Sequence, residues 1–266
     1  MSGDRHFTTG DGCRIAYRID GPDDRPVLAL SNSIATDLHM WDRSVPALSR
    51  SFRLLRYDTR GHGGSDAPVG AYSMDRLGRD VVELLDALGI DRAHFLGLSL
   101  GGFIGQWLGI FAPERIDRLI LSNTASYLAS ELPFDDQIRA VLAASNVDGI
   151  AEGFMRNWFP ATMLAAPNEI VDEFRGMVLT TPPRGLAGCY AALRDVDLRR
   201  VISLIATPTL VIGGESDTVT RASHSETIAA TIANAKLVLL PGVHILNVEQ
   251  ADRFNDVVSN FLRSAP

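Results

Sequence analysis

Of all residues in this chain, a serine with a glycine two positions away on each side is the clearest candidate for a catalytic group. Ser99 is the centre of a Gly-x-Ser-x-Gly pentapeptide, residues 97–101, which follows the apolar run 94–98 and opens the almost wholly apolar segment 101–111. This order predicts a buried strand, a sharp turn and a buried helix, with the serine hydroxyl held at the turn. Glycines suit the flanking positions because a Cβ atom there would clash with the neighbouring strand and helix. The pattern predicts a nucleophile at Ser99, although the same serine could instead only cap the helix.

Two loops late in the chain carry an acid and a base that would serve such a nucleophile. Asp217 follows the apolar run 209–213, and His244 follows the run 236–240. The chain order serine, acid, histidine is one known arrangement of a catalytic triad. Because the carboxyl ends of parallel strands meet at one edge of a sheet, we expect both side chains near Ser99. His244 would take the serine proton, and Asp217 would orient the imidazole and stabilise its protonated form.

Other residues could fill the same two roles. His62 lies on a loop expected near the site and is the rival base, although it precedes the serine in the chain. The rival acids are Glu215, Asp195 and Asp197. Without a triad, Asp217 would only cap the following helix and His244 would be an ordinary loop histidine.

Short apolar runs alternate with helical patterns over most of the chain, and they define the expected framework. The predicted strands are 14–19, 27–31, 53–57, 94–98, 118–122, 209–213 and 236–240. Their continuous hydrophobicity is typical of strands buried on both faces of a parallel sheet. Helices such as 74–88, with apolar residues at three- and four-residue spacing, would form right-handed crossovers between them. The fold class predicted from this alternation is α/β with a mostly parallel sheet.

The alternation stops between about residues 124 and 200. Helical patterns dominate this stretch, and several prolines interrupt it. We predict a helical lid over the sheet rather than a separate domain. The chain would then consist of a first core part (1–123), the lid (124–200) and a second core part (201–266).

Composition limits the partners that this protein could have. The 266 residues carry a net charge of −7 and no run of lysine or arginine, which argues against a nucleic-acid partner. No apolar run approaches the roughly 20 residues that span a bilayer, and residues 1–10 lack the apolar stretch of a signal peptide. We therefore expect a cytoplasmic protein that does not bind membranes. Cys13 and Cys189 are too few for a structural zinc site.

Several segments resemble 3-oxoadipate enol-lactonases of the α/β-hydrolase superfamily. They are 30–33 with 37–41, 56–66, 94–102 with 105–107, and 213–220. The resemblance implies an eight-stranded, mostly parallel sheet flanked by helices, with the lid inserted after the sixth strand. It implies that the chain hydrolyses 3-oxoadipate enol-lactone to 3-oxoadipate, in the β-ketoadipate pathway of aromatic compound degradation, through an acyl-enzyme. It also implies that no metal and no organic cofactor takes part.

The same resemblance suggests how the substrate would be held. The backbone N–H groups of Leu100, at the helix N-terminus, and of Ile34 would form the oxyanion hole. Asn32 and Ser33 stand where many relatives carry His-Gly, and either could add a side-chain donor. The sequence leaves the oligomeric state open, a homo-oligomer included.

The lactone carries a carboxylate, whose natural partner is a lid arginine or a tryptophan N–H. The candidates are Arg139, Arg156, Arg194 and Trp158. A lid arginine could instead lie in a surface ion pair, and Trp158 could be lid core. Trp41 is a further candidate for the pocket wall, with core packing as its alternative.

Two other functions compete with the lactonase hypothesis. A general carboxylesterase or a perhydrolase-like enzyme would share the triad but prefer neutral esters. A non-catalytic ligand receptor on a hydrolase scaffold is disfavoured because all three triad positions are filled. Haloalkane dehalogenation is disfavoured because that chemistry uses a carboxylate nucleophile and position 99 is a serine.

Overall fold

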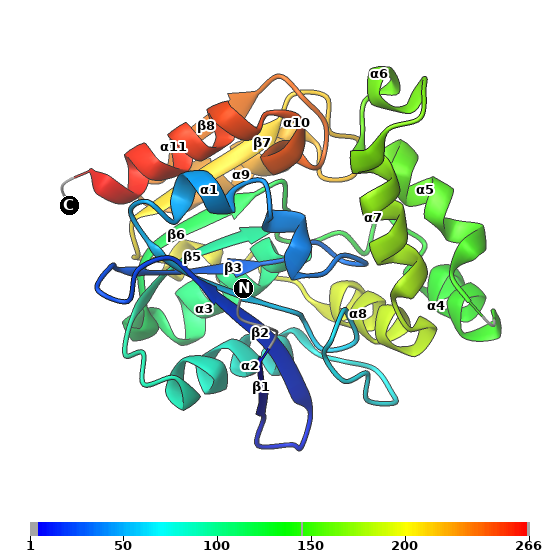
Figure 1. The fold of residues 1–266 in the computed structure, drawn as a ribbon, viewed down its shortest axis with the longest axis horizontal. Helices are drawn as coiled ribbons and strands as arrows, with labels where there is room; N and C mark the ends of the chain where they lie inside the picture. The colour runs from blue at the N-terminus through cyan, green and yellow to red at the C-terminus, as the bar shows by residue number, and fades with distance from the viewer. Residues whose placement is uncertain (1–4, 145, 265–266) are drawn as a thin grey trace.

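An eight-stranded sheet forms the centre of the structure, a computed structural model that describes residues 5–144 and 146–264 (Figure 1). The strand order is β1-β2-β4-β3-β5-β6-β7-β8. The strands are β1 (Arg5–Thr8), β2 (Arg14–Asp20), β3 (Val27–Ser31), β4 (Arg53–Tyr57), β5 (Ala93–Leu98), β6 (Ile116–Ser122), β7 (Thr209–Gly214) and β8 (Lys236–Leu240). β1 and β2 pair antiparallel to their neighbours, and every other pair is parallel. The expected mostly parallel sheet is confirmed.

Burial explains which strands can be predicted from apolar runs in the sequence. Every residue of β7 is buried, as are the last four residues of β3, β4, β5 and β6, so these strands appear as continuous apolar runs. β1 is an edge strand whose residues are exposed or half-buried, and its sequence Arg-His-Phe-Thr carries no such run. It is the one strand of the sheet that the apolar runs do not predict.

Helices cover both faces of the sheet. α2 (Met74–Ala87) packs on α3 (Leu100–Phe111), and α3 packs on β3, β5 and β6. α1 (Val45–Leu48) and α11 (Ala251–Arg263) pack together over the opposite face (Figure 1). The remaining core helices are η1 (Leu38–Trp41), η2 (Pro113–Arg115), η3 (Ile202–Leu204), α9 (Ala222–Thr231) and α10 (Leu246–Glu249). Within the described ranges, no helix combines the length and the apolar character needed to cross a bilayer.

In the described ranges, five α-helices lie between β6, the sixth strand of the sheet, and η3, which precedes β7. They are α4 (Phe134–Ala143), α5 (Asp148–Trp158), α6 (Ala161–Leu164), α7 (Glu169–Thr180) and α8 (Pro183–Asp195). α4 packs on α8 and α5 packs on α7, so this helical segment contains two helix pairs, and the short α6 contacts α5. Figure 1 shows the segment at one end of the molecule, beyond the carboxyl ends of the strands. That position is where parallel α/β sheets place their ligands.

Candidate active site

Ser99 lies in a strained turn between β5 and α3. Its φ is +57° and its ψ is −114°, a conformation that a residue other than glycine keeps only when its surroundings enforce it. A Cβ atom on Gly97 would lie 2.0 Å from the carbonyl oxygen of Gly101, and one on Gly101 would lie 2.3 Å from that of Ser31. The glycines therefore permit the close strand–helix contact that forces the turn. The Ser99 side chain makes no capping hydrogen bond to α3, so the alternative of a simple helix cap is wrong.

His244 and Asp217 form a buried pair at the ends of β8 and β7. His244 Nδ1 lies 2.8 Å from Asp217 Oδ2, and the two residues are 1% and 4% exposed. Burial by itself would raise the pKa of Asp217. The charge of His244 and hydrogen bonds from His244, Asn123 and the Val219 N–H outweigh burial and lower that pKa to about 2. Asp217 is therefore a carboxylate at neutral pH and can accept the Nδ1 proton of His244, which leaves Nε2 unprotonated as a base.

Asn123 holds this carboxylate from the end of β6. Its Nδ2 donates to Asp217 Oδ2 at 2.9 Å and to the carbonyl oxygen of Val243 at 3.1 Å. Its own φ is +44°, a left-handed conformation that asparagine tolerates better than most residues. One side chain thus ties together the loops that carry the acid and the base. Asn123 is not among the residues predicted from the sequence, where its place directly after a predicted strand is the only signal for it.

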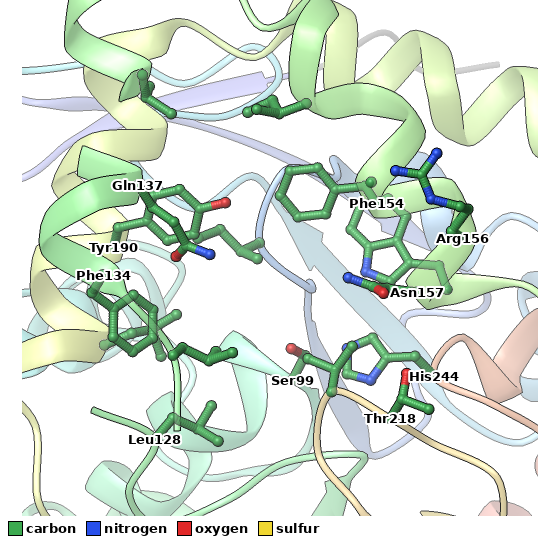
Figure 2. A pocket seen from close by; sticks show the side chains of 18 of the residues that line it. Ser99, Leu128, Phe134, Gln137, Phe154, Arg156, Asn157, Tyr190, Thr218 and His244 are labelled. Carbon is green, nitrogen blue, oxygen red and sulfur yellow. The ribbon is translucent and has the colours of Figure 1, made fainter. Parts of the chain in front are cut away.

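Ser99 and His244 line one cavity of about 620 Å³, together with Ile34 and Thr218. Figure 2 shows the two side chains next to each other at the floor of this cavity. Residues from three distant loops, at 34, 99 and 244, therefore meet at one place. An alcohol, an imidazole and a carboxylate at such a place can carry out acyl transfer.

Comparisons with known proteins agree with this geometry. The model of the alpha/beta hydrolase fold family matches residues 26–251. The chain belongs to the α/β-hydrolase family. It is 36% identical to 3-oxoadipate enol-lactonase 2 of Acinetobacter baylyi, over 96% of this chain and 95% of that protein.

Two crystal structures are also similar to this α/β-hydrolase. A hydrolase from Pseudomonas aeruginosa PA01 has a TM-score of 0.96 and 54% identity, and 98% of both chains is covered. The enol-lactonase from Burkholderia xenovorans LB400 has a TM-score of 0.93 and 36% identity, with 98% of this chain and 100% of that chain covered. The expected fold class and the resemblance to enol-lactonases are confirmed, and the protein is a hydrolase enzyme.

His62, the rival base, has a different place in this α/β-hydrolase. It is buried, and its Nε2 accepts a hydrogen bond of 2.9 Å from the backbone N–H of Ala35. Burial lowers the pKa of His62 to about 4, so the ring is neutral and its Nε2 lone pair is occupied. Ala35 directly follows Ile34 and has a φ of +59°. His62 therefore fixes the loop that presents the Ile34 N–H and does not line the cavity.

Three predicted substrate contacts of this hydrolase, Asn32, Ser33 and Trp41, do not line the cavity, so the structure corrects these expectations. Asn32 donates to the carbonyl oxygen of Tyr57 and accepts from Nε1 of Trp41, which is fully buried. The Ser33 N–H lies 3.3 Å from the sulfur of Met40. Asn32 and Trp41 thus hold the loop after β3 in place, whereas the buried Ser33 Oγ has no hydrogen-bond partner in the described part of the chain. Sequence spacing alone does not show which way these side chains turn.

The predicted lid contacts divide into two groups. Arg139 and Arg194 line a separate depression, each in an ion pair with a neighbouring aspartate. Arg139 is therefore corrected to a surface ion pair with Asp136. Arg156 and Trp158 line the cavity above Ser99.

Three polar cavity residues between β6 and β7 were not predicted from the sequence: Gln137, Asn157 and Tyr190. Figure 2 shows Gln137 and Tyr190 on one wall and Asn157 on the other, near Ser99 and His244. The Oε1 atom of Gln137 is buried and has no hydrogen-bond partner in the described part of the chain. These residues lie in α4, α5 and α8, and the sequence does not reveal which surfaces of these helices face each other.

Proposed function

We propose that this hydrolase opens 3-oxoadipate enol-lactone to 3-oxoadipate with Ser99, His244 and Asp217 as its triad. The observation that carries the proposal is the buried His244–Asp217 pair, 2.8 Å apart, whose imidazole lines the same cavity as the strained Ser99. We infer the substrate from the two similar proteins that are named enol-lactonases. With that substrate the enzyme would act in the β-ketoadipate pathway.

The proposed reaction begins when Ser99 Oγ attacks the lactone carbonyl while His244 Nε2 removes its proton. Asp217 stabilises the resulting imidazolium through Nδ1. The oxyanion is held by the N–H groups of Leu100 and Ile34. Neither N–H donates to a protein acceptor within residues 5–144 and 146–264, so both are free for this task.

The leaving group is the ring enol, which stays tethered to the acyl chain. An enol leaves readily as an enolate, so the demand on His244 as an acid is modest. Water then cleaves the acyl-enzyme with His244 again as base, and 3-oxoadipate is released.

The substrate carboxylate would be held by the wall of α5. In the described part of the chain, the indole N–H of Trp158 donates to no protein acceptor, and Arg156 forms an ion pair with none of the acidic residues. Asn157 lies between them and is seen close to Ser99 in Figure 2. We assign the direct contact to Trp158 and Asn157, and the charge attraction to Arg156.

Steady-state kinetics with two substrates test the proposal. We expect kcat/KM for the enol-lactone to exceed that for a neutral aryl ester, and Ser99→Ala to abolish both activities while the thermal unfolding curve stays unchanged. A tenfold advantage of the neutral ester would replace the lactonase by a general esterase. A wild-type protein that a fluorophosphonate leaves unlabelled would instead be a ligand receptor.

A further inference from the structure

The cavity above Ser99 is larger than the proposed lactone requires. Its volume of about 620 Å³ corresponds to roughly 20 water molecules, whereas the enol-lactone has about ten non-hydrogen atoms. Pockets of about 300–1,000 Å³ are the size that takes drug-sized ligands. About half of this cavity is therefore left for another part of a substrate.

The extra space lies between two helices of the lid. α4 is packed on α8 and α5 on α7, and the cavity is lined by residues of both α4 and α5. On α5 the lining includes Trp158 at the end of the helix and extends from Asn157, near Ser99 in Figure 2, back to Gly149. Asn157 and Gly149 are eight positions apart, which is about 12 Å along a helix. The cavity thus includes a slot about two helical turns long that leads away from the nucleophile.

The far part of this slot has no polar side chain among its described lining residues. Ala140 and Val141 of α4 lie there with Gly149, Ile150 and Gly153 of α5. Ala140 and Gly149 are exposed, so the slot opens to solvent at this end. The polar residues that α4 and α5 contribute to the cavity, Gln137, Arg156 and Asn157, lie in other turns of these helices, and Gln137 and Asn157 lie towards Ser99 in Figure 2. A reacting polar group near Ser99 and a linear apolar arm in the slot would match this division.

We propose that this hydrolase also accepts esters and lactones that carry a linear alkyl arm, and that the arm lies in the slot between α4 and α5. The proposal rests on the proposed role of Ser99 as nucleophile, but not on the enol-lactone as substrate. The reaction is the same hydrolysis: the acyl C–O bond breaks, water supplies hydroxyl to the acyl carbon, and its proton goes to the leaving alcohol. An arm in the slot is removed from water, which favours binding in proportion to the apolar area covered.

Gly153 offers a sharp test because it lines the slot and has open space around it. A Cβ atom built on Gly153 meets nothing within 4 Å. The Cβ atom of Gly153→Leu therefore displaces no neighbour, the rest of the side chain takes up space in the slot, and leucine favours the helix more than glycine does. The matched control is Gly176→Leu in α7, where a Cβ atom also meets nothing within 4 Å but the residue does not line the cavity.

The measurement is kcat/KM for p-nitrophenyl acyl esters from acetate to octanoate and for γ-lactones with alkyl substituents of the same lengths. For wild type we expect an increase of about two- to fourfold per methylene in at least one of the two series, until the slot is filled. Gly153→Leu should reduce the value for the longest substrate at least tenfold and leave that for the shortest within about twofold. Gly176→Leu should behave like wild type.

Two results would overturn the inference. One is a wild-type enzyme whose kcat/KM does not rise with chain length in either series. The other is a Gly153→Leu variant that affects short and long substrates equally while it unfolds at the wild-type temperature. Failure of the enol-lactone assay, with the chain-length preference intact, would remove the proposed substrate and leave the slot assignment standing.

Discussion

Replacing Asp217 by asparagine tests the proposed triad most directly, because the two oxygens of this residue accept five hydrogen bonds. Oδ2 accepts from His244 Nδ1, from Asn123 Nδ2 and from the hydroxyl of Thr220. Oδ1 accepts from the backbone N–H groups of Val219 and Thr220. Only a carboxylate can accept at both positions, whereas an amide presents an N–H₂ donor at one of them.

In either orientation, the amide N–H₂ of the asparagine would face N–H or O–H groups that now donate to Asp217. With Nδ2 in the place of Oδ2, the amide would donate to His244 Nδ1, so the imidazole would carry its proton on Nε2 and could not act as a base. With Nδ2 in the place of Oδ1, two backbone N–H groups lose their acceptor. A buried donor without a partner costs about 1–3 kcal/mol, so we expect the free energy of unfolding of Asp217→Asn to fall by about 2–4 kcal/mol.

The expected kinetic effect is larger than the effect on stability. The wrong imidazole tautomer costs about 10⁴-fold in kcat in a serine protease triad, and we expect a loss of about 10³- to 10⁴-fold here. The assay is steady-state hydrolysis of the enol-lactone, with chemical denaturation of the same samples. Glu215→Gln is the matched control, because Glu215 is exposed on the same loop and was the next candidate acid. An Asp217→Asn enzyme within tenfold of wild type, or a Glu215→Gln enzyme that loses activity, would refute the assignment.

Three further predictions follow from the same contacts. His62→Ala removes the acceptor of the Ala35 N–H, so kcat should fall about 10²-fold with little change in KM, as for loss of an oxyanion donor; His62→Gln should recover part of that loss in the same assay. Arg156→Ala should raise KM for the carboxylate-bearing lactone about tenfold and leave that for a neutral aryl ester unchanged; equal effects on both would exclude Arg156 from carboxylate binding. The folded-state pKa of Asp217 is about 2, below its usual value of 3.8, so its contribution of roughly 2 kcal/mol is complete above about pH 4 and is lost as the pH falls towards 2. Acid denaturation followed by circular dichroism should show this loss of stability. Asp217→Asn should show a shallower slope, because Asp11, whose pKa is also lowered, still contributes.

The sheet and the nucleophile turn of this enzyme can be predicted from the sequence because burial and close backbone contacts restrict the residue types at single positions. Buried parallel strands must be apolar along their whole length, and the glycines at 97 and 101 are required by contacts of 2.0 and 2.3 Å with backbone atoms. β1 cannot be predicted in this way, because an exposed edge strand needs no apolar run. Asn123 escapes prediction because its role depends on two loops that follow it by about a hundred residues.

The direction of a side chain is harder to infer than its element. Asn32 and Trp41 lie in the loop expected to border the site, yet they hydrogen-bond to each other inside the core. Arg139 and Arg156 were equivalent candidates in the sequence because both lie on lid helices. Only the packing of α4 on α8 and of α5 on α7 places one in a surface ion pair and the other on the cavity wall.

The residues that carry out the reaction and the residues that select the substrate therefore lie in different parts of the fold. The nucleophile, acid and base lie at strand ends, where the sheet and the buried hydrogen bonds leave each side chain few alternatives. The remaining cavity wall comes largely from α4 and α5, where Gly149 and Gly153 have free space around them. Substitutions there can reshape the slot without disturbing the triad. We therefore expect that exchanges on the facing surfaces of α4 and α5 change which esters and lactones are hydrolysed, whereas exchanges at the strand ends abolish hydrolysis of all of them.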